Sequence, residues 1–300
     1  MNFNTINETG AAPNEAETET AYKEKALSEF EFRIIRDYIH DYCGIFFEDA
    51  KIQTLAMRLS FRMAVLDIGS FLEYYNYLKF HHRGEAEMAD LISRLTNNET
   101  YFFRETNQLS LLVSRLKEKK QAGSIAPFRI LSCGCSSGEE AYTLAIMLDE
   151  AGVYDQCKIE ITGMDIDQKI LQKAESAEFT AYSLRSTDSE RTERYFLKNG
   201  EKYLLDESIR NRVRFLHGNL VEHDIFEEIK DMDAILCRNV FIYFSDAAIC
   251  RAVETFYNAL ARDGCLLLGH SESLSRITDM FIAERHKNAM FYVKREIRDV

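Results

Sequence analysis

The chain of 300 residues contains no tryptophan and only two prolines, and it has no apolar run of the length that crosses a bilayer. A membrane-spanning helix needs roughly 18 or more apolar residues in succession, so we expect no direct membrane insertion. There is no secretory signal pattern either. Scarce proline argues against a low-complexity or secreted modular chain, whereas 46% hydrophobic residues suffice for one large domain and a small one with a proper core.

Basic residues and paired cysteines are also in short supply. Lys and Arg number 37 against 49 Asp and Glu, which gives a net charge of −12. Nucleic-acid binding depends on clustered Lys and Arg, so neither nucleic acid nor an anionic membrane is an expected partner. The seven cysteines are odd in number and scattered, which is typical of reduced thiols in the cytoplasm. Cys133 and Cys135 lack a second Cys or His pair at ligand spacing, so no metal is predicted.

A glycine-containing loop follows the apolar run that ends near Leu131. The turn-forming residues 133–138 include Gly134 and Gly138, and a helical pattern begins at Glu139. Strand, loop and helix in this order form the first unit of a nucleotide-binding α/β fold. The loop has neither the dinucleotide pattern nor a Walker lysine, and Glu139 with Glu140 would repel a pyrophosphate at the start of the helix. These features favour S-adenosylmethionine, which carries no phosphate.

A second strand over 159–164 ends at an acidic residue. Asp165 follows the loop by about 25 positions, where a carboxylate at the end of the second strand can bind ribose hydroxyls. Asp167 is predicted to cap the helix over 168–176. The alternative is that both aspartates only cap the helix.

The sequence changes character several times along its length. Residues 1–27 are predicted to be a disordered acidic arm, and 28–95 a helical N-terminal domain. A signature segment and a linker helix occupy 96–126. Strands and helices alternate over 127–300, which predicts a mostly parallel sheet closed by a last strand. A helix and a hairpin at about 182–212 interrupt this alternation.

Four blocks of sequence together resemble the CheR family, the chemotaxis receptor methyltransferases. The first, T-N-N-E-T-Y-F-F-R-E at 96–105, is similar to the family signature T-x-N-x-T-x-F-F-R-E. The second is the loop and helix start at 134–142, and the fourth is G-H-S-E-S-L at 269–274. The third, D-A-I-L-C-R-N-V-F-I-Y-F at 233–244, carries the specific C-R-N-V-x-I-Y-F pattern. The likeness runs from about 28 to 294.

This resemblance implies a Rossmann-like class I methyltransferase domain with a small β-hairpin insertion, preceded by an all-α N-terminal domain. It also implies a transferase that moves a methyl group from S-adenosylmethionine to glutamate side chains of chemoreceptor cytoplasmic domains, in the signal transduction of chemotaxis. The product would be S-adenosylhomocysteine, and no metal is implied. Two alternatives stay open: a methyltransferase for another protein or a small carboxylate, and a non-catalytic cofactor-binding regulator.

Position by position, the resemblance also implies site residues. Arg104 and Tyr243 would be catalytic, because they would orient the acceptor carboxylate. The implied cofactor-binding residues are Asn98, Thr100, Arg104, Gly134, Glu139, Glu140, Asp165, Asn219, Leu220, Arg238 and Asn239. From sequence alone, Thr100 has an alternative as a helix cap and Arg238 as a structural ion-pair partner. At least two of Tyr101, Phe102 and Phe103 are expected to pack in the core.

Two further features bear on the partner. Lys51, Arg58 and Arg62 are spaced i, i+7 and i+11, which puts them on one stripe of a helix. The resemblance implies that such a stripe docks the acidic helical bundle of a chemoreceptor, and the alternative is an ordinary solvated face. Family members that tether to a receptor's C-terminal peptide have a longer Gly-containing turn than residues 195–203 offer, so we expect no peptide tether.

Overall fold

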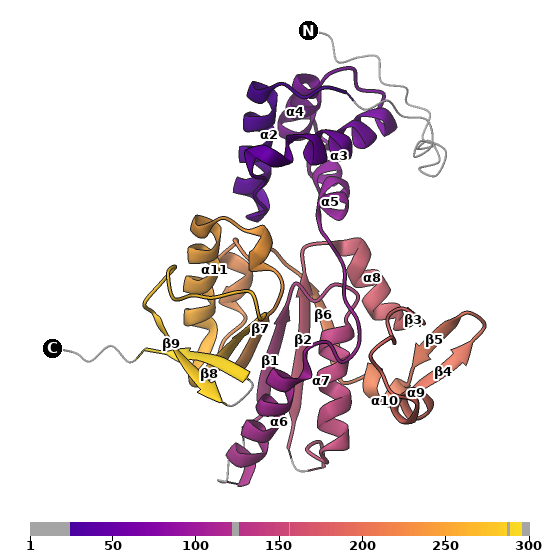
Figure 1. The fold of residues 1–300 in the computed structure, drawn as a ribbon, viewed down its shortest axis with the longest axis vertical. Coiled ribbons are helices and arrows are strands. Elements are labelled where there is room, and N and C mark those ends of the chain that lie inside the picture. The colour runs from indigo at the N-terminus through magenta and orange to yellow at the C-terminus, as the bar shows by residue number, and fades with distance from the viewer. Residues whose placement is uncertain (1–24, 122–125, 156, 287–288, 296–300) are drawn as a thin grey trace, which may run out of the picture. The chain divides into compact units, whose positions relative to one another are not determined.

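The computed structural model describes residues 25–121, 126–155, 157–286 and 289–295. These residues form two compact units (Figure 1). The first contains the described residues through Ile39 together with Phe46–Leu95, and the second contains His40–Ile45 and the described residues from Thr96 onward. The predicted acidic arm falls almost wholly outside the described residues.

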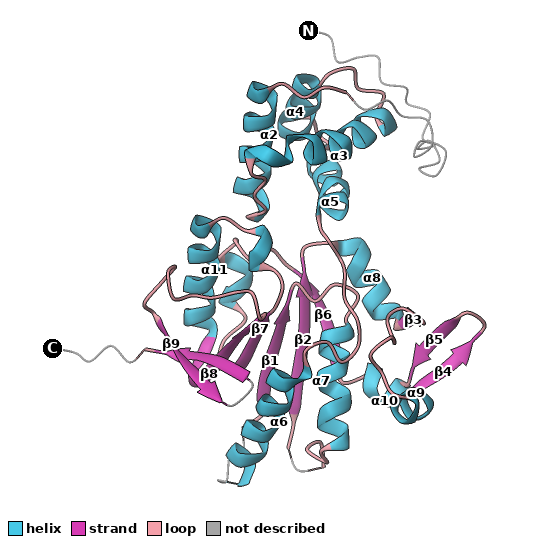
Figure 2. Ribbon diagram, viewed as in Figure 1, coloured by secondary structure: helices cyan, strands magenta, loops and turns pink. Residues whose placement is uncertain are grey.

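The first unit is all-helical, as Figure 2 shows. It contains α2 (Glu29–Cys43, whose last residues belong to the second unit), η1 (Asp49–Lys51), α3 (Ile52–Val65), α4 (Phe71–Phe80) and α5 (Gly84–Leu95). Ser70 begins α4 by accepting a hydrogen bond from the backbone N–H of Glu73, a standard N-cap. Ile35, Leu55, Leu59 and Leu91 lie fully buried where the helices meet.

A buried ion pair stands within this helical core. The Arg62 guanidinium donates to both carboxylate oxygens of Glu87, at 2.9 and 2.6 Å, and also to Asp90. The Tyr74 hydroxyl donates to Glu87 at 2.6 Å. The side chains of Arg62 and Glu87 are 3% and 4% exposed. Because both charges are paired and hydrogen-bonded, they can remain in the core.

This pairing corrects the predicted docking stripe. Lys51 is exposed, but Arg62 is buried and ion-paired, so it presents no charge to a partner. Arg58 is half-buried, and its guanidinium donates to the backbone carbonyl of Leu95. The spacing put the three residues near one face of α3, but that face turns toward α5 over part of its length.

The second unit is built on a seven-stranded sheet of order β6-β2-β1-β7-β8-β10-β9. The first five of these strands are parallel, and β10 and β9 add an antiparallel hairpin at one edge. The strands are β1 (Phe128–Cys133), β2 (Ile159–Asp165), β6 (Val213–His217), β7 (Met232–Cys237), β8 (Leu260–Leu268), β9 (Phe281–His286) and β10 (Ala289–Lys294). This is the fold class that the sequence predicted.

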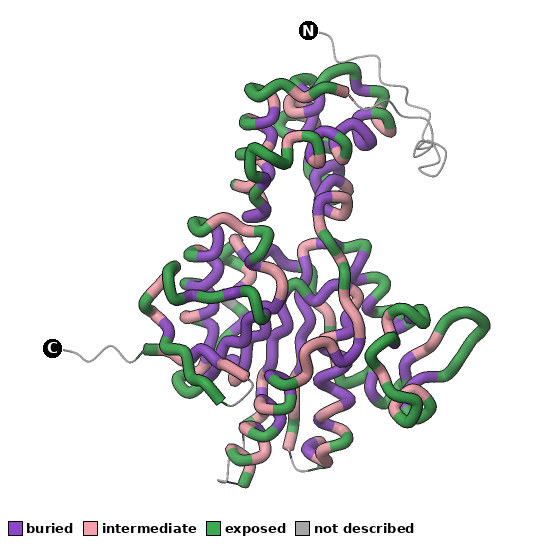
Figure 3. Tube along the Cα trace, viewed as in Figure 1, coloured by how far each residue is buried: buried purple, intermediate pink, exposed green. Residues whose placement is uncertain are grey.

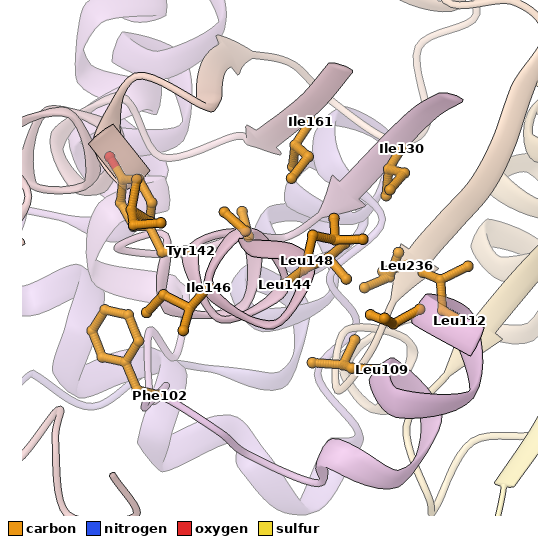
Figure 4. Close-up of a cluster of buried hydrophobic side chains, with 14 of the residues drawn as sticks. Phe102, Leu109, Leu112, Ile130, Tyr142, Leu144, Ile146, Leu148, Ile161 and Leu236 are labelled. Atoms are coloured by element: carbon orange, nitrogen blue, oxygen red, sulfur yellow. The ribbon is translucent and has the colours of Figure 1, made fainter. Parts of the chain in front are cut away.

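Helices cover both faces of this sheet. On one face α6 (Thr106–Gln121) and α7 (Glu139–Glu150) pack their leucines against Ile130 and Leu236 (Figure 4). On the other face α11 (Asp246–Ala259) packs against Leu131 and Ile235. Neighbouring residues of one strand thus serve opposite cores, as the two-residue period of a strand requires. Figure 3 shows the buried residues concentrated along the central strands. The helix α8 (Gln168–Ser176) contacts β2 and β6.

A smaller sheet of order β3-β5-β4 lies outside the main one. It belongs to a segment that we call the excursion, residues 178–210. The excursion contains β3 (Glu178–Thr180), α9 (Ser189–Tyr195), β4 (Phe196–Asn199), β5 (Lys202–Leu205) and α10 (Glu207–Arg210). The predicted helix and hairpin are present, and β3 joins them ahead of the expected start because it pairs antiparallel with β5. Among the described residues, none of the helices combines the length and apolar character needed to cross a bilayer.

Candidate functional site

Most of the predicted site residues gather at the carboxyl ends of the parallel strands. Gly134 follows β1, Asp165 ends β2, and Arg238 with Asn239 follows β7. In open α/β sheets, ligands bind at this edge, where neighbouring strands lead to loops on opposite faces.

The loop after β1 has a tight shape that glycine makes possible. Gly134 has a φ of +62° and is exposed, and a Cβ there would stand 2.5 Å from Val240 Cγ2. Gly138 has a φ of +90°, and a Cβ there would stand 2.9 Å from Phe215 Cζ. Both positions therefore require glycine, and the backbone of Gly134 stays open to a ligand.

Asp165 ties this loop to the end of β2. Its carboxylate accepts from the backbone N–H of Ser136 at 2.8 Å and of Asp167 at 2.9 Å. Burial raises the pKa of Asp165, and the two N–H donors oppose that shift. Asp167 caps α8 by accepting from Lys169 N and Ile170 N, so that prediction is confirmed. Asp165 makes no contact of this kind with α8, and its carboxylate serves the glycine loop.

Glu140 and Glu139 differ in their surroundings although they are adjacent. Glu140 accepts from Ser132 Oγ and from Arg238 Nη1, both at 2.8 Å, and is partly exposed. Glu139 is buried, and its carboxylate accepts from Ser137 Oγ at 2.7 Å. Burial raises the pKa of Glu139. Of the two predicted cofactor carboxylates, Glu140 is therefore the more accessible.

Arg238 joins three segments of the chain. Besides Glu140, its guanidinium contacts the backbone carbonyls of Arg104 and Glu105, each at 3.2 Å, and the Glu105 carboxylate at 3.1 Å. The side chain is 2% exposed. These contacts agree with the structural alternative for Arg238. Its Nε–H is buried without an acceptor among the described residues, which leaves one donor that a bound polar group would satisfy.

The signature segment, residues 96–105, has an unusual backbone. Phe103 and Glu105 have φ values of +60° and +49°, which cost about 1–3 kcal/mol each for residues other than glycine. The bonds from Arg238 to the carbonyls of residues 104 and 105 help to hold this conformation. Phe102 and Phe103 are buried, as expected for at least two of the three aromatic residues. The first helix after Thr100 begins at Thr106, so the helix-cap alternative for Thr100 is wrong.

The signature segment also contacts the glycine loop. The Asn98 side-chain amide donates to Asp167 Oδ2 at 3.0 Å, and the backbone carbonyl of Asn98 accepts from Ser136 Oγ at 3.0 Å. Arg104 is half-buried and donates to the Glu99 carbonyl at 3.2 Å. The structure thus brings Asn98 into contact with the loop that follows β1, whereas the side-chain hydrogen bond of Arg104 stays within the signature segment.

Tyr243 stands in the short helix η3 (Phe241–Tyr243) beyond β7, with 36% of its surface exposed. Its hydroxyl accepts a hydrogen bond from the Asn97 amide at 3.0 Å. Asn97 was not predicted as a site residue, because it occupies a variable position of the signature. The contact brings the signature segment and the loop after β7 together.

Asn219 and Leu220 lie in the loop after β6 and are both buried. The Asn219 amide donates to the Tyr42 carbonyl at 2.6 Å and to Glu222 at 3.1 Å, and its oxygen accepts from Val221 N. The polar atoms of Asn219 therefore hold this loop, while Leu220 packs in the core.

Glu272 is a further residue that sequence reasoning left without a role. Its carboxylate, 6% exposed, accepts from the backbone N–H groups of Asn239, Phe241 and Gly269. Its position within the fourth resemblance block, shortly after a strand, was the one sequence feature that could have marked Glu272 as a site residue.

Comparison with known proteins agrees with this geometry. Residues 98–290 match the family described as CheR methyltransferase, SAM binding domain, and residues 31–96 match CheR methyltransferase, all-alpha domain. Chemotaxis protein methyltransferase 2 of Vibrio cholerae is 39% identical over 276 residues, which is 90% of this chain and 95% of the relative. Chemotaxis protein methyltransferase 2 of Pseudomonas aeruginosa is 34% identical over 248 residues (81% and 86%). Chemotaxis protein methyltransferase of Escherichia coli is 30% identical over 261 residues (85% and 88%).

Proposed function

The chain belongs to the CheR methyltransferase family, and we propose that it methylates glutamate side chains on the cytoplasmic domains of chemoreceptors. It is an S-adenosylmethionine-dependent methyltransferase. The observation that carries the proposal is the convergence of the signature segment, the glycine loop and the loop of Tyr243 at one end of the sheet.

The residues at this edge suit S-adenosylmethionine. Gly134 gives a ligand access to the backbone, and Glu140 and Asp165 supply carboxylates for ammonium or hydroxyl donors. The loop offers no lysine to a phosphate. The buried Nε–H of Arg238 is a donor for a bound polar group. Asn98 contacts the same loop. The other residues of the proposed cofactor site rest on the family resemblance: Thr100, Glu139, Asn219, Leu220 and Asn239.

Bound S-adenosylmethionine supplies a methyl group on a sulfonium, which a carboxylate oxygen can displace. A glutamate has an unperturbed pKa of about 4.3, so it is ionised at neutral pH and needs no general base. The protein therefore has to orient the acceptor and exclude water from it. Arg104 serves as the orienting cation through its fork of donors, and the Tyr243 hydroxyl fixes a carboxylate oxygen. A tight bidentate grip would weaken the nucleophile, so positioning is the expected role.

The acceptor and the compartment belong to the same proposal. The partner is the helical bundle of a chemoreceptor cytoplasmic domain, and the protein works in the cytoplasm, where its scattered thiols stay reduced. The hairpin of the excursion supports binding without a peptide tether, because β4 and β5 are joined by only Gly200 and Glu201. Tight calorimetric binding of a receptor-tail peptide would contradict that part.

The test is transfer of labelled methyl from S-adenosylmethionine to a receptor cytoplasmic fragment. Base-labile label on the fragment is expected, because a glutamate methyl ester hydrolyses in base. Arg104→Ala and Tyr243→Phe should each lower turnover by roughly 100-fold, the order of loss that misplacing a reacting group causes. Arg276→Ala, at an exposed arginine, and Tyr203→Phe, on β5, are the matched controls.

Other outcomes would change the proposal. Label that survives base would exclude a glutamate ester. Cofactor binding with no label on the receptor fragment, but label on another protein or a small carboxylate, would move the activity to a different acceptor.

A further inference from the structure

Glu272 is a buried carboxylate, and burying a carboxylate costs free energy unless hydrogen-bond donors compensate it. The carboxylate is buried in the loop after β8, at the end of the strand beside β7. Its Oε2 accepts from Asn239 N at 2.8 Å and from Gly269 N at 2.6 Å, and its Oε1 accepts from Phe241 N at 2.7 Å. Three backbone N–H donors satisfy both oxygens, and the carboxylate in turn holds these three donors in place.

The backbone that Glu272 holds is the one that carries Tyr243. Asn239 has a φ of +61°, a left-handed conformation that asparagine tolerates better than most residues, and the bond from its N–H to Glu272 helps to hold it there. From there the chain makes one short turn, in which Tyr243 N donates to the Val240 carbonyl at 3.1 Å. Gly269 permits the close approach, since a Cβ there would lie 2.8 Å from Glu272 Oε2.

The hydroxyl end of the Tyr243 side chain is held by Asn97. The Tyr243 hydroxyl accepts from the Asn97 amide, which leaves the hydroxyl proton to donate elsewhere. Tyr243 is therefore fixed twice: its backbone by a carboxylate from the loop after β8, and its oxygen by an amide from the signature segment.

We propose that Glu272 and Asn97 are positioning residues for Tyr243, which act on turnover by fixing the direction of its hydroxyl. The proposal rests on the function given above, in which Tyr243 orients the acceptor carboxylate. Neither residue needs to touch the acceptor or the cofactor. Asn97 is not one of the specified positions of the family signature, so its role is inferred from the contact alone.

Glu272→Gln tests the backbone contact with almost no change in shape. A glutamine has only one carbonyl oxygen, and its amide group would face at least one N–H that now has an acceptor. The loop of Asn239 and Phe241 should lose part of its anchorage. Asn97→Ala tests the hydroxyl contact alone, at an exposed residue where folding is not at risk.

The experiment measures kcat, cofactor affinity and melting temperature for both variants, with and without Tyr243→Phe. Glu272→Gln should lower kcat by roughly 10- to 100-fold, and Asn97→Ala by about 10-fold, the value of one hydrogen bond. In the Tyr243→Phe background, adding Glu272→Gln or Asn97→Ala should lower kcat by less than about twofold relative to Tyr243→Phe alone, because the hydroxyl that they position is absent. Glu254→Gln, an exposed glutamate on α11, is the matched control and should match the wild type.

The possible results separate the two proposals. Equal fold losses with and without Tyr243→Phe would show that Glu272 and Asn97 act independently of Tyr243, and would overturn this inference alone. A Tyr243→Phe variant with wild-type turnover would overturn both the catalytic role of Tyr243 and the inference built on it. If Glu272→Gln fails to fold, the Asn97→Ala cycle decides.

Discussion

Carboxylates of similar sequence context behave differently in this protein according to what surrounds them. Burial raises the pKa of Glu139 and of Asp165. The Lys119 ammonium, 2.8 Å away, lowers the pKa of Asp263. The sequence identified Glu139, Glu140 and Asp165 as a group through the motif, but not which of them faces inward. Spacing along one chain does not specify that Ser137 meets Glu139 or that Arg238, almost a hundred residues away, meets Glu140.

These shifts predict opposite pH dependences for two substitutions. A carboxyl with a raised folded pKa binds more protons folded than unfolded, so its contribution to the free energy of unfolding falls as pH rises from its unfolded pKa, about 4.3 for Glu, through the folded pKa. Glu139→Gln should therefore gain stability relative to the wild type as pH rises above about 4. The lowered pKa of Asp263 has the reverse effect, because that stability is present above the unfolded pKa and lost as pH falls.

Denaturant unfolding at several pH values checks this pair. Asp263→Asn should lose stability relative to the wild type as pH rises, by a small amount because its side chain is mostly exposed. Slopes of the same sign for the two variants would contradict the assignment of burial to Glu139 and ion pairing to Asp263.

At the scale of the elements, the sequence predicted the parallel strands and their helices and missed β3 and β9. β3 has three residues, too few to show the alternation of buried and exposed side chains that marks a strand. β9 has only Phe281 buried, so its sequence lacks the alternation of a strand, and its pairing with β10 makes it one. The left-handed backbone conformations of Phe103, Glu105 and Asn239 could not be predicted from the sequence either, since partners distant in the chain stabilise them.

The glycine loop gives the element-scale prediction. Gly134→Ala should weaken S-adenosylmethionine binding by about 10-fold or more, because a Cβ would meet Val240 and an alanine at positive φ costs roughly 1–2 kcal/mol. Adding Val240→Ala removes the overlap and should recover part of the affinity. Calorimetric titration with the cofactor measures both.

Gly152→Ala is the matched control for this loop. Gly152 has a φ of +63°, and no atom of the described residues lies within 4 Å of the point where a Cβ would stand, so an alanine there bears the backbone strain without the overlap. Wild-type affinity in Gly134→Ala would mean that the cofactor does not depend on this loop shape.

At the scale of the whole molecule, the sequence predicted an all-α domain followed by a Rossmann-like methyltransferase domain, and the structure and the family agree. Periodicity predicted the helical region and the mostly parallel sheet because each layer has a continuous apolar face, and the family resemblance implied the methyltransferase domain. It failed for the docking stripe, since a helical period does not distinguish an arginine that faces solvent from one paired inside a core, as Arg62 is.

Arg62 provides the prediction at this scale. Arg62→Leu leaves Glu87 buried without its cation, which should destabilise the first unit by about 3–5 kcal/mol. The proposed cofactor residues all belong to the second unit, so cofactor binding should persist at denaturant concentrations where the helical unit has unfolded. Circular dichroism and cofactor titration in parallel measure this. Adding Glu87→Leu should recover stability, and loss of binding in step with the helical signal would contradict the expectation.

The ends of the excursion have a consequence for how such an enzyme can change over generations. Ala177 precedes β3, and its carbonyl accepts from the N–H of Leu205 at the end of β5 at 3.0 Å, so the chain departs and returns at neighbouring points. The intervening residues form their own small sheet. The exposed tip of the hairpin between β4 and β5 can therefore differ in length without moving the ends of the excursion, whereas Phe179 and Phe196 at its base pack in the core of the main sheet. Sequence change over generations is thus least constrained at the tip of this hairpin and most constrained at its base.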